Sequence, residues 1–374
     1  MRITFIVPTV SLNGGTRVVV IYAQALVRMG HIVRIISQPP QPMPLRRKLK
    51  WWIFGNGPLN DRWPPTSHLD GSGLDHHVLD RCRPVTDVDV PDGDVVIATW
   101  WETAEWVTAL SPNKGAKVYF IQHHEIFPYL PVERCEATYR MPLHKIVVSR
   151  WLQRVMSTRY GDEVVTLVPN SVDRTQFFAP ERGKQSTPTV GVLYSTTPSK
   201  GLDVSLSALQ IVRDKLPDLH TVSFGSYQLN SNFALPKGAE FFLRPPQDKI
   251  RDLYAQCDVW ITASRSEGFN LPAMEAMACR TPVVSTRTGW PEEAVKTSVN
   301  GVLVDIDDRV GFVDAIQWVL SRSDEDWRRL SANAYATVAP CSWRTSAKMF
   351  EEALKNACRR SARGEIAGKC AYLS

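Results

Sequence analysis

Two glutamates in the second half of the chain stand where carboxylates could bind a sugar compound. Glu267 and Glu275 are the acidic residues of segment 264–285, SRSEGFNLPAMEAMACRTPVVS, and seven residues separate them. Glu267 follows a predicted strand, whereas Glu275 lies about one turn into a helix that we expect to begin at Leu271. A carboxylate at Glu275 can accept two hydrogen bonds from a ribose diol, and Glu267 can accept hydrogen bonds from sugar hydroxyls.

The turn between the two glutamates is suited to an anion. It consists of Gly268, Phe269, Asn270 and Leu271. At a helix start the backbone N–H groups lack partners within the helix, and the helix dipole is positive there. The pattern therefore predicts a diphosphate site that needs no metal ion.

Alternating strands and helices must position this segment. Residues 2–8 form a β-branched apolar run, and a polar break at 11–15 separates it from an apolar segment at 18–29. Gly30 ends that predicted helix, and residues 31–37 give a second strand. This order of strand, glycine turn, helix and strand predicts a parallel, doubly wound sheet.

The same alternation continues along the chain and is interrupted at two places. Residues 38–73 are rich in proline, tryptophan and glycine, and residues 177–189 are polar and are predicted to be a linker. Further strands are predicted at 94–98, 117–121, 145–149, 164–168, 190–194, 220–224, 259–262, 282–285 and 301–304, and helices at 202–215, 248–256, 271–279 and 310–321. We expect two Rossmann-like domains with a cleft between them, and ligands beyond the carboxyl ends of the strands.

Composition places the chain among ordinary globular proteins. Of its 374 residues, 44% are hydrophobic and 22% are charged, which excludes a disordered or collagen-like chain. Seven cysteines with no CxxC pair argue against a disulfide framework and a structural zinc site. No apolar run approaches the roughly 18 residues that span a bilayer, and the first residues, MRITFIVP, lack a cleavage pattern. We therefore expect a cytoplasmic protein.

The segment around the two glutamates resembles a known family, the retaining glycosyltransferase family four of GT-B fold. The family signature is E-x7-E in the context EGFxxPxxEAMAxxxPVV, and residues 267–284 match nearly every position. Further marks are Gly14-Gly15, Gly30-His31, PNSVD at 169–173, Lys200-Gly201 and GVLVD at 301–305. The resemblance implies an acceptor-side domain at 1–178, a nucleotide-sugar donor domain at 179–345, and a C-terminal helix and basic tail at 346–374 that cross back to the first domain.

The resemblance also implies roles for single residues. Lys200 is expected to contact the donor diphosphate as a point charge, and Gly14 and Gly15 to let the backbone approach the donor phosphate closely. Glu267 corresponds to the residue that contacts the transferred sugar, and Glu275 to the one that binds the ribose.

A histidine near the reacting carbon of the sugar is a further mark of the family. The sequence offers His123 and His124, and both remain candidates. The family usually has an arginine five residues before the lysine, where this chain has Ser195. The hydroxyls of Ser195 and Thr196 can donate to phosphate oxygens, and Arg244 or Arg265 are the candidates to replace the missing cation.

The expected function is that of a retaining, metal-independent, hexosyl-type glycosyltransferase with no cofactor. It would move a sugar from a nucleotide-sugar donor to a glycan or lipid-linked acceptor in polysaccharide or cell-envelope biosynthesis. Since the fold hosts other chemistry, a sugar-nucleotide epimerase and a non-catalytic nucleotide-sugar binding protein are the alternatives.

For two motifs the sequence leaves open whether the role is ligand contact or purely structural. Residues 169–173 either contact the ligand or form an Asx turn that closes a strand. Trp100, Trp101 and Trp106 either stack on an acceptor sugar or pack in the core.

The net charge of +6 is concentrated in two stretches. Residues 46–54 carry +4, from Arg46, Arg47, Lys48 and Lys50, followed at once by Trp51 and Trp52. The tail at 355–369 adds five cations against Glu365, which leaves −2 for the remainder of the chain. Cations next to tryptophans favour peripheral contact with an anionic membrane, here on its inner face, over nucleic acid as a partner. The alternative is a solvated loop.

Overall fold

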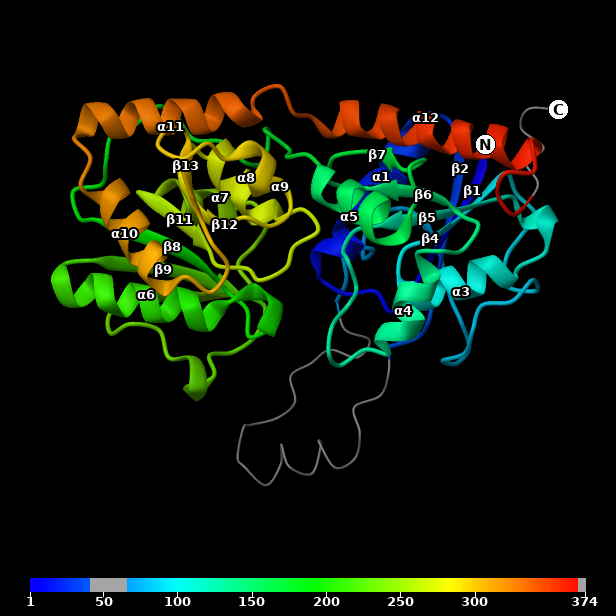
Figure 1. Cartoon of the computed structure of the whole chain (residues 1–374), viewed down its shortest axis with the longest axis horizontal. Helices are drawn as coiled ribbons and strands as arrows, with labels where there is room; N and C mark the ends of the chain where they lie inside the picture. The colour runs from blue at the N-terminus through cyan, green and yellow to red at the C-terminus, as the bar shows by residue number, and fades with distance from the viewer. Residues whose placement is uncertain (41–65, 369–374) are drawn as a thin grey trace. The chain divides into compact units, whose positions relative to one another are not determined.

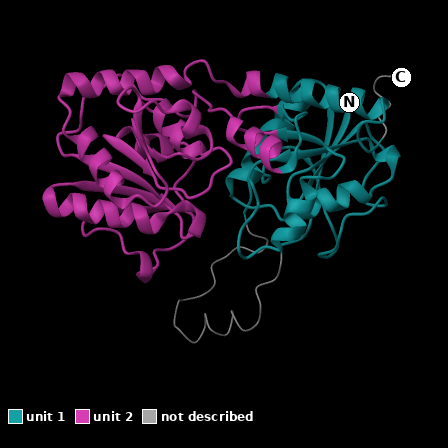
Figure 2. Ribbon diagram, in the orientation of Figure 1, with its two compact units in different colours: residues 1–146, 160–166, 347–374 teal, residues 147–159, 167–346 magenta. Residues whose placement is uncertain are grey.

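The computed structural model describes residues 1–40 and 66–368. By contacts the chain divides into unit 1, residues 1–146, 160–166 and 347–374, and unit 2, residues 147–159 and 167–346 (Figure 2). Residues 147–159 and 167–178 thus group with unit 2, although they stand within the range expected for the first domain. The predicted membrane segment at 46–54 lies outside the described residues.

Unit 1 is built on a sheet of seven strands in the order β3-β2-β1-β4-β5-β6-β7 (Figure 1). The strands are β1 (Arg2–Val7), β2 (Ile32–Ser37), β3 (Asp75–Val78), β4 (Val95–Ala98), β5 (Ala116–Ile121), β6 (His144–Val147) and β7 (Thr166–Leu167). β1 pairs in parallel with β2 and with β4, so that Ile3 lies opposite Val33 and Val95. β4, β5 and β6 are buried along their whole length, as expected for parallel strands covered on both faces.

Among the described residues of the first half of the chain, the helices are α1 (Gly14–Arg28), α3 (Trp101–Ala109), α4 (Val132–Thr138) and α5 (Arg150–Tyr160), with a 3-10 turn η1 (Pro112–Lys114). Helix α1 begins at Gly14, earlier than the expected apolar start at Val18. Asn13 caps the helix, because its side chain accepts a hydrogen bond from the N–H of Thr16 at 2.7 Å. The prediction that Gly14 and Gly15 form a turn before the helix is therefore wrong, since both lie in its first turn.

The last helix, α12 (Trp343–Ala362), returns to unit 1. Its Phe350 is fully buried and stacks on Tyr22 of α1 at a ring distance of 4.5 Å. Phe120 of β5 meets the same ring edge-on at 5.0 Å, and Phe5 of β1 stacks at 6.2 Å. The expectation that the C-terminal helix rejoins the first half of the chain is confirmed.

Unit 2 contains a second sheet, of six parallel strands in the order β10-β9-β8-β11-β12-β13. Its strands are β8 (Thr189–Tyr194), β9 (His220–Gly225), β10 (Glu240–Leu243), β11 (Val259–Thr262), β12 (Val283–Thr286) and β13 (Gly301–Val304). Besides most of α5, its remaining elements are η2 (Pro198–Lys200), α6 (Leu202–Lys215), η3 (Ser231–Phe233), α7 (Ile250–Ala255), α8 (Leu271–Ala278), α9 (Trp290–Ala294), α10 (Arg309–Leu320) and α11 (Asp324–Val338). α6 packs against α10, and α8 packs against α7 and α11. The alternation predicted from the sequence is confirmed in both units.

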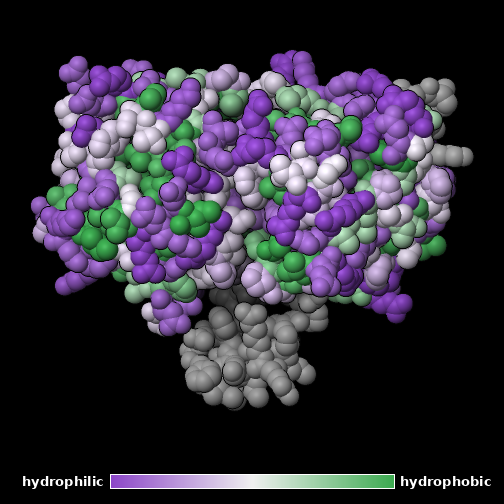
Figure 3. Space-filling model, viewed as in Figure 1, coloured by the Kyte–Doolittle hydropathy of each residue, from purple (hydrophilic) through white to green (hydrophobic). Residues whose placement is uncertain are grey.

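Polar and apolar residues are interspersed on the face shown in Figure 3. Across residues 1–40 and 66–368, no helix has both the length and the apolar character that crossing a membrane requires. Five of the described cysteines are free, whereas Cys358 is disulfide-bonded. The sequence did not predict this disulfide.

Candidate functional site

Lys200 and Glu267 form an ion pair at the carboxyl ends of two neighbouring strands of unit 2. The ammonium lies 2.7 and 2.9 Å from the two carboxylate oxygens of Glu267. Ser264 donates a further hydrogen bond to Glu267, at 2.7 Å. Gly201 has φ of +60°, and a Cβ there would lie 1.9 Å from the carbonyl oxygen of Ala263. Glycine after Lys200 is therefore required for the chain to pass this close to β11.

The turn into α8 is held by side-chain hydrogen bonds. Asn270 has φ of +78°; its Nδ2 donates to Thr262 Oγ1 at 3.0 Å, and its Oδ1 accepts from the N–H of Ala273 at 3.4 Å. Pro272 has no N–H to offer. An anion at this turn would consequently be bound by the amides of residues 268–271, the same four residues that the sequence singled out.

The loop that precedes α9 packs against this turn. The N–H of Trp290 donates to the carbonyl of Phe269 at 2.8 Å, and the two rings stack at 5.8 Å. Gly289 has φ of +61°, and a Cβ there would lie 2.9 Å from Phe269 O and 3.1 Å from Glu267 Cβ. The loop before α9 therefore packs directly against the backbone that carries Glu267.

Glu275 lies on α8 as predicted and is buried, with 5% of its surface exposed. The hydroxyl of Tyr254, on α7, donates to its Oε2 at 3.0 Å. Tyr254 is itself packed edge-on against Trp260 of β11 at 4.6 Å. The hydrogen bond from the packed Tyr254 side chain thus fixes the position of the Glu275 carboxylate.

The position of the missing arginine is occupied by exposed or half-exposed hydroxyls. Ser195 Oγ lies 3.3 Å from Thr197 Oγ1, and Thr196 is exposed. Arg265 is engaged elsewhere, because its guanidinium binds Asp203 at 2.7 and 3.0 Å and Asp307 at 2.7 Å. The hydrogen bonds with Asp203 raise the pKa of this guanidinium further.

Arg244 follows β10 and has φ of +47°. Its Nε donates to the carbonyl of Ser226 at 2.8 Å. Of the two predicted replacements for the arginine, Arg265 is therefore already committed to acidic partners, and Arg244 remains a prediction.

A small cavity of about 20 Å³ lies at this place in unit 2. Lys200, Glu267, Asn270, Ser264 and Thr262 are among the residues that line it. The structure thus brings together the lysine, the first glutamate and the helix turn that the sequence singled out. The roles of Ser264 and Tyr254 were not predicted. Ser264 could have been found from its position three residues before Glu267.

The predicted residues of unit 1 form a separate group. Gln122 Nε2 donates to the carbonyl of Gly15 at 3.3 Å, which joins the end of β5 to the start of α1. His124 Nε2 lies 2.7 Å from the hydroxyl of Tyr160, and the ring packs against Tyr139 at 5.4 Å. The His123 ring packs against Phe127 at 5.0 Å instead. The two histidines therefore have different surroundings within unit 1.

The two motifs with open readings have structural roles. Asp173 Oδ1 accepts hydrogen bonds from the N–H and the hydroxyl of Thr175 at 2.8 and 2.7 Å, which is the pattern of an Asx turn. Trp101 and Trp106 are buried, with 4% and 9% of their surfaces exposed. Core packing is therefore the better reading for these two tryptophans.

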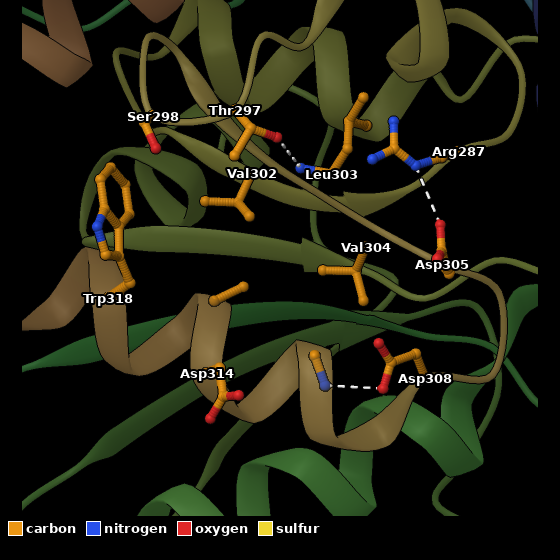
Figure 4. A pocket seen from close by; sticks show the side chains of 12 residues that line it. Arg287, Thr297, Ser298, Val302, Leu303, Val304, Asp305, Asp308, Asp314 and Trp318 are labelled. Carbon is orange, nitrogen blue, oxygen red and sulfur yellow. Dashed lines mark hydrogen bonds and ion pairs between the residues drawn. The ribbon is translucent and has the colours of Figure 1, made fainter.

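A larger cavity in unit 2, of about 380 Å³, lies between β13 and α10 (Figure 4). Trp318 and Asp314 of α10 line one side of it, and Arg287, paired with Asp305 at 3.0 Å, lies on another. None of the predicted site residues lines this cavity. Among the described residues, no three His, Cys, Asp or Glu side chains are grouped so that they could hold a metal ion.

Comparison with known sequences finds a match to a family over part of the chain. Residues 173–337 match the family described as glycosyl transferases group 1, and this range contains Lys200, Glu267 and Glu275. The D-inositol 3-phosphate glycosyltransferase of Corynebacterium urealyticum is 38% identical over 114 residues, which is 30% of this chain and 26% of the relative. The chain thus matches about a quarter of the length of that relative.

A longer match is found to a mycobacterial enzyme. The GDP-mannose-dependent alpha-(1-6)-phosphatidylinositol monomannoside mannosyltransferase of Mycolicibacterium smegmatis is 29% identical over 245 residues, 58% of this chain and 62% of the relative.

Solved structures show the same fold at low sequence identity. Anabaena HepE in complex with UDP and glucose superposes with a TM-score of 0.69 at 16% identity, covering 95% of this chain and 100% of that chain. S. aureus TarM in complex with fondaparinux, alpha-GlcNAc-glycerol and UDP superposes with a TM-score of 0.72 at 10% identity, with the same coverage. The predicted GT-B fold is confirmed.

Proposed function

We propose that the chain is a retaining glycosyltransferase of the hexosyl type. The proposal is carried by one observation: the Lys200–Glu267 pair lies beside the turn 268–271, and Glu275 lies on the helix α8 that begins at this turn, all inside the range that matches glycosyl transferases group 1. The UDP-glucose bound in a solved structure of Anabaena HepE is the kind of compound that such a group would bind.

In this function the residues of unit 2 bind the donor and its leaving group. A diphosphate beside Lys200 would share the ammonium with Glu267 and receive hydrogen bonds from the amides of residues 268–271. These donors are fixed in place and can stabilise the charge that develops on the departing nucleoside diphosphate. Glu267 would orient the sugar, and Glu275 the ribose. His123 or His124 would lie near the reacting carbon.

The acceptor is proposed to be a glycan or a lipid-linked compound of cell-envelope or polysaccharide synthesis. The mycobacterial relative is named for a phosphatidylinositol monomannoside acceptor, which supports this class. We further propose that neither a cofactor nor a metal ion takes part, because Lys200 and the helix turn provide the positive groups.

The test is an assay with a panel of radiolabelled UDP- and GDP-sugars. We expect release of nucleoside diphosphate that depends on the acceptor and persists in EDTA. The product should have retained anomeric configuration by NMR. Isomerisation of the donor without release would favour an epimerase instead. Tight donor binding without turnover, for every donor and acceptor, would favour a non-catalytic binding protein.

We also propose peripheral contact of residues 46–54 with an anionic membrane on its cytoplasmic side. The basic and aromatic sequence supports this proposal. Co-sedimentation with anionic vesicles that weakens with salt is expected. Equal sedimentation with neutral vesicles would contradict it.

A further inference from the structure

Unit 1 contains a buried carboxyl group next to the two candidate histidines. Glu125 follows β5 and has 1% of its surface exposed. Its Oε2 accepts a hydrogen bond from the backbone N–H of Trp101, the first residue of α3, at 2.8 Å, and another from the hydroxyl of Tyr119 at 3.2 Å. The group is thus anchored to α3 and to β5.

The surroundings of this carboxyl favour its protonated, uncharged form. Burial raises the pKa of Glu125 well above its usual range, and the hydrogen bonds from Trp101 and Tyr119 oppose this only in part. The titratable groups that face it are the phenols of Tyr119, Tyr129 and Tyr139 and the thiol of Cys135 on α4.

These neighbours carry no charge at neutral pH. Burial raises the pKa of Cys135 to about 11 and those of Tyr119 and Tyr139 well above their usual range. The Glu125 carboxyl therefore lies among uncharged groups, and ionising it would place a charge in an apolar environment.

Contacts of the Glu125 backbone connect this group to the histidines. Its N–H donates to the hydroxyl of Tyr139 at 2.8 Å, and that hydroxyl in turn lies 3.5 Å from the carbonyl of His123. The ring of Tyr139 packs against His124, whose Nε2 meets the Tyr160 hydroxyl at 2.7 Å. The backbone at 123–125 is consequently held by Tyr139 on one side and by the buried carboxyl on the other.

We propose that Glu125 is a positioning residue for sugar transfer, whose buried carboxyl group fixes the backbone that carries His123 and His124. The inference rests on the proposed function, because it assigns the histidines to the reacting sugar. It adds a residue that touches neither donor nor acceptor and acts only through that backbone.

The test compares two variants of nearly equal size. Glu125→Gln places at this position a side-chain amide whose oxygen can accept both hydrogen bonds, so kcat at pH 7 is expected within about 3-fold of the wild type. Glu125→Leu removes the acceptor and is expected to lower kcat at least about 30-fold. The Kd for nucleoside diphosphate should change less than about 3-fold in both variants, because Lys200, residues 268–271 and Glu275, to which we assign most of its binding, lie in unit 2.

A pH profile separates positioning from general support of the fold. As the pH rises through the titration of Glu125, the wild type should lose activity, whereas Glu125→Gln should not show this loss. Undiminished kcat in Glu125→Leu, or equal damage in the Gln and Leu variants at pH 7, would overturn the proposal. If Glu125→Leu does not fold, Tyr119→Phe is expected to lower kcat in its place, and an unchanged kcat there would overturn the proposal equally. This substitution deletes one of the two hydrogen bonds to the carboxyl, together with the contacts of the Tyr119 hydroxyl with Thr138 and Tyr139.

A second measurement does not depend on activity. The imidazole NMR signals of His123 and His124 should shift in Glu125→Leu and stay at the wild-type positions in Glu125→Gln. Unmoved signals in Glu125→Leu contradict the positioning role. Absence of transfer by the wild type with every donor, together with shifted imidazole signals, would refute the proposed function while leaving the positioning of the histidines intact.

Discussion

Glu275 is the residue whose substitution tests donor binding most directly. Its carboxylate is buried and oriented by the Tyr254 hydroxyl, so it is held ready to accept hydrogen bonds from a ribose diol. A hydrogen bond to a charged group contributes about 1.5–3 kcal/mol, so Glu275→Ala is expected to weaken nucleoside diphosphate binding by about 10- to 100-fold. Isothermal titration calorimetry measures the change.

The control for this substitution is Asp314→Ala. Asp314 is an exposed carboxylate that lines the larger cavity between β13 and α10, outside the candidate site. Its removal is expected to leave the affinity for nucleoside diphosphate unchanged. A folded Glu275→Ala variant with wild-type affinity would contradict the assignment of Glu275 to the ribose.

Glu267 is predicted to act on the sugar and not on the nucleotide. Glu267→Gln keeps a side chain that can accept the Ser264 hydrogen bond but loses the charge opposite Lys200. Turnover should fall by about 100-fold, in line with the loss of an interaction that orients the reacting sugar. Binding of free nucleoside diphosphate should not weaken, because Lys200 no longer shares its ammonium. Weaker diphosphate binding with normal kcat would reverse the two roles of Glu267 and Glu275.

At the scale of elements, His144 links β6, β7 and α12 through hydrogen bonds that require an uncharged ring. Arg360 Nη1 lies 3.1 Å from its Nδ1 and Thr166 Oγ1 lies 3.2 Å from its Nε2, so the ring accepts from the arginine and donates to the threonine. Burial, with a smaller effect from the charge of Arg360, lowers the pKa of His144 from 6.5 to about 4. Between these values the unfolded chain binds a proton that the folded chain does not.

The stability of the fold should therefore decline as the pH falls from 6.5 towards 4. The contribution of His144 is about 3 kcal/mol over this window. Urea unfolding of wild type and His144→Gln at several pH values measures it, since glutamine can make both hydrogen bonds without titrating. In the variant, the free energy of unfolding should depend less on pH, because the contribution of His144 is missing. The same dependence on pH in both proteins would contradict the prediction.

The elements that the sequence predicted are those with continuous apolar runs. β4, β5 and β11 are buried throughout, and a run such as VWIT at 259–262 indicates a covered strand without further context. β3 and β10 were missed because edge strands need no such run; their sequences, DHHV and EFFL, are largely exposed or half-buried.

Some residues of the candidate site could likewise be predicted from the sequence, and others could not. Lys200 and Glu267 could be predicted because each lies in a short motif next to a strand end. The contact from Tyr254 to Glu275 could not, since it depends on how α7 packs against α8. The burial of Glu125 was equally hidden, because glutamate is almost never fully buried and only the packing of α3 and α4 around it encloses it.

At the scale of the whole molecule, α12 makes the end of the chain part of unit 1, so a substitution near residue 350 should destabilise a unit that begins at residue 1. Phe350→Ala removes a ring that is fully buried among Phe5, Tyr22 and Phe120. The cavity left behind should cost about 3–5 kcal/mol. Calorimetric unfolding should show this loss in the transition of unit 1, while nucleoside diphosphate still binds to unit 2.

Met349→Ala is the matched control, because the neighbouring Met349 side chain is 42% exposed and its removal should have little effect. Equal effects of the two substitutions, or loss of nucleotide binding together with the unfolding of unit 1, would contradict this division of the molecule.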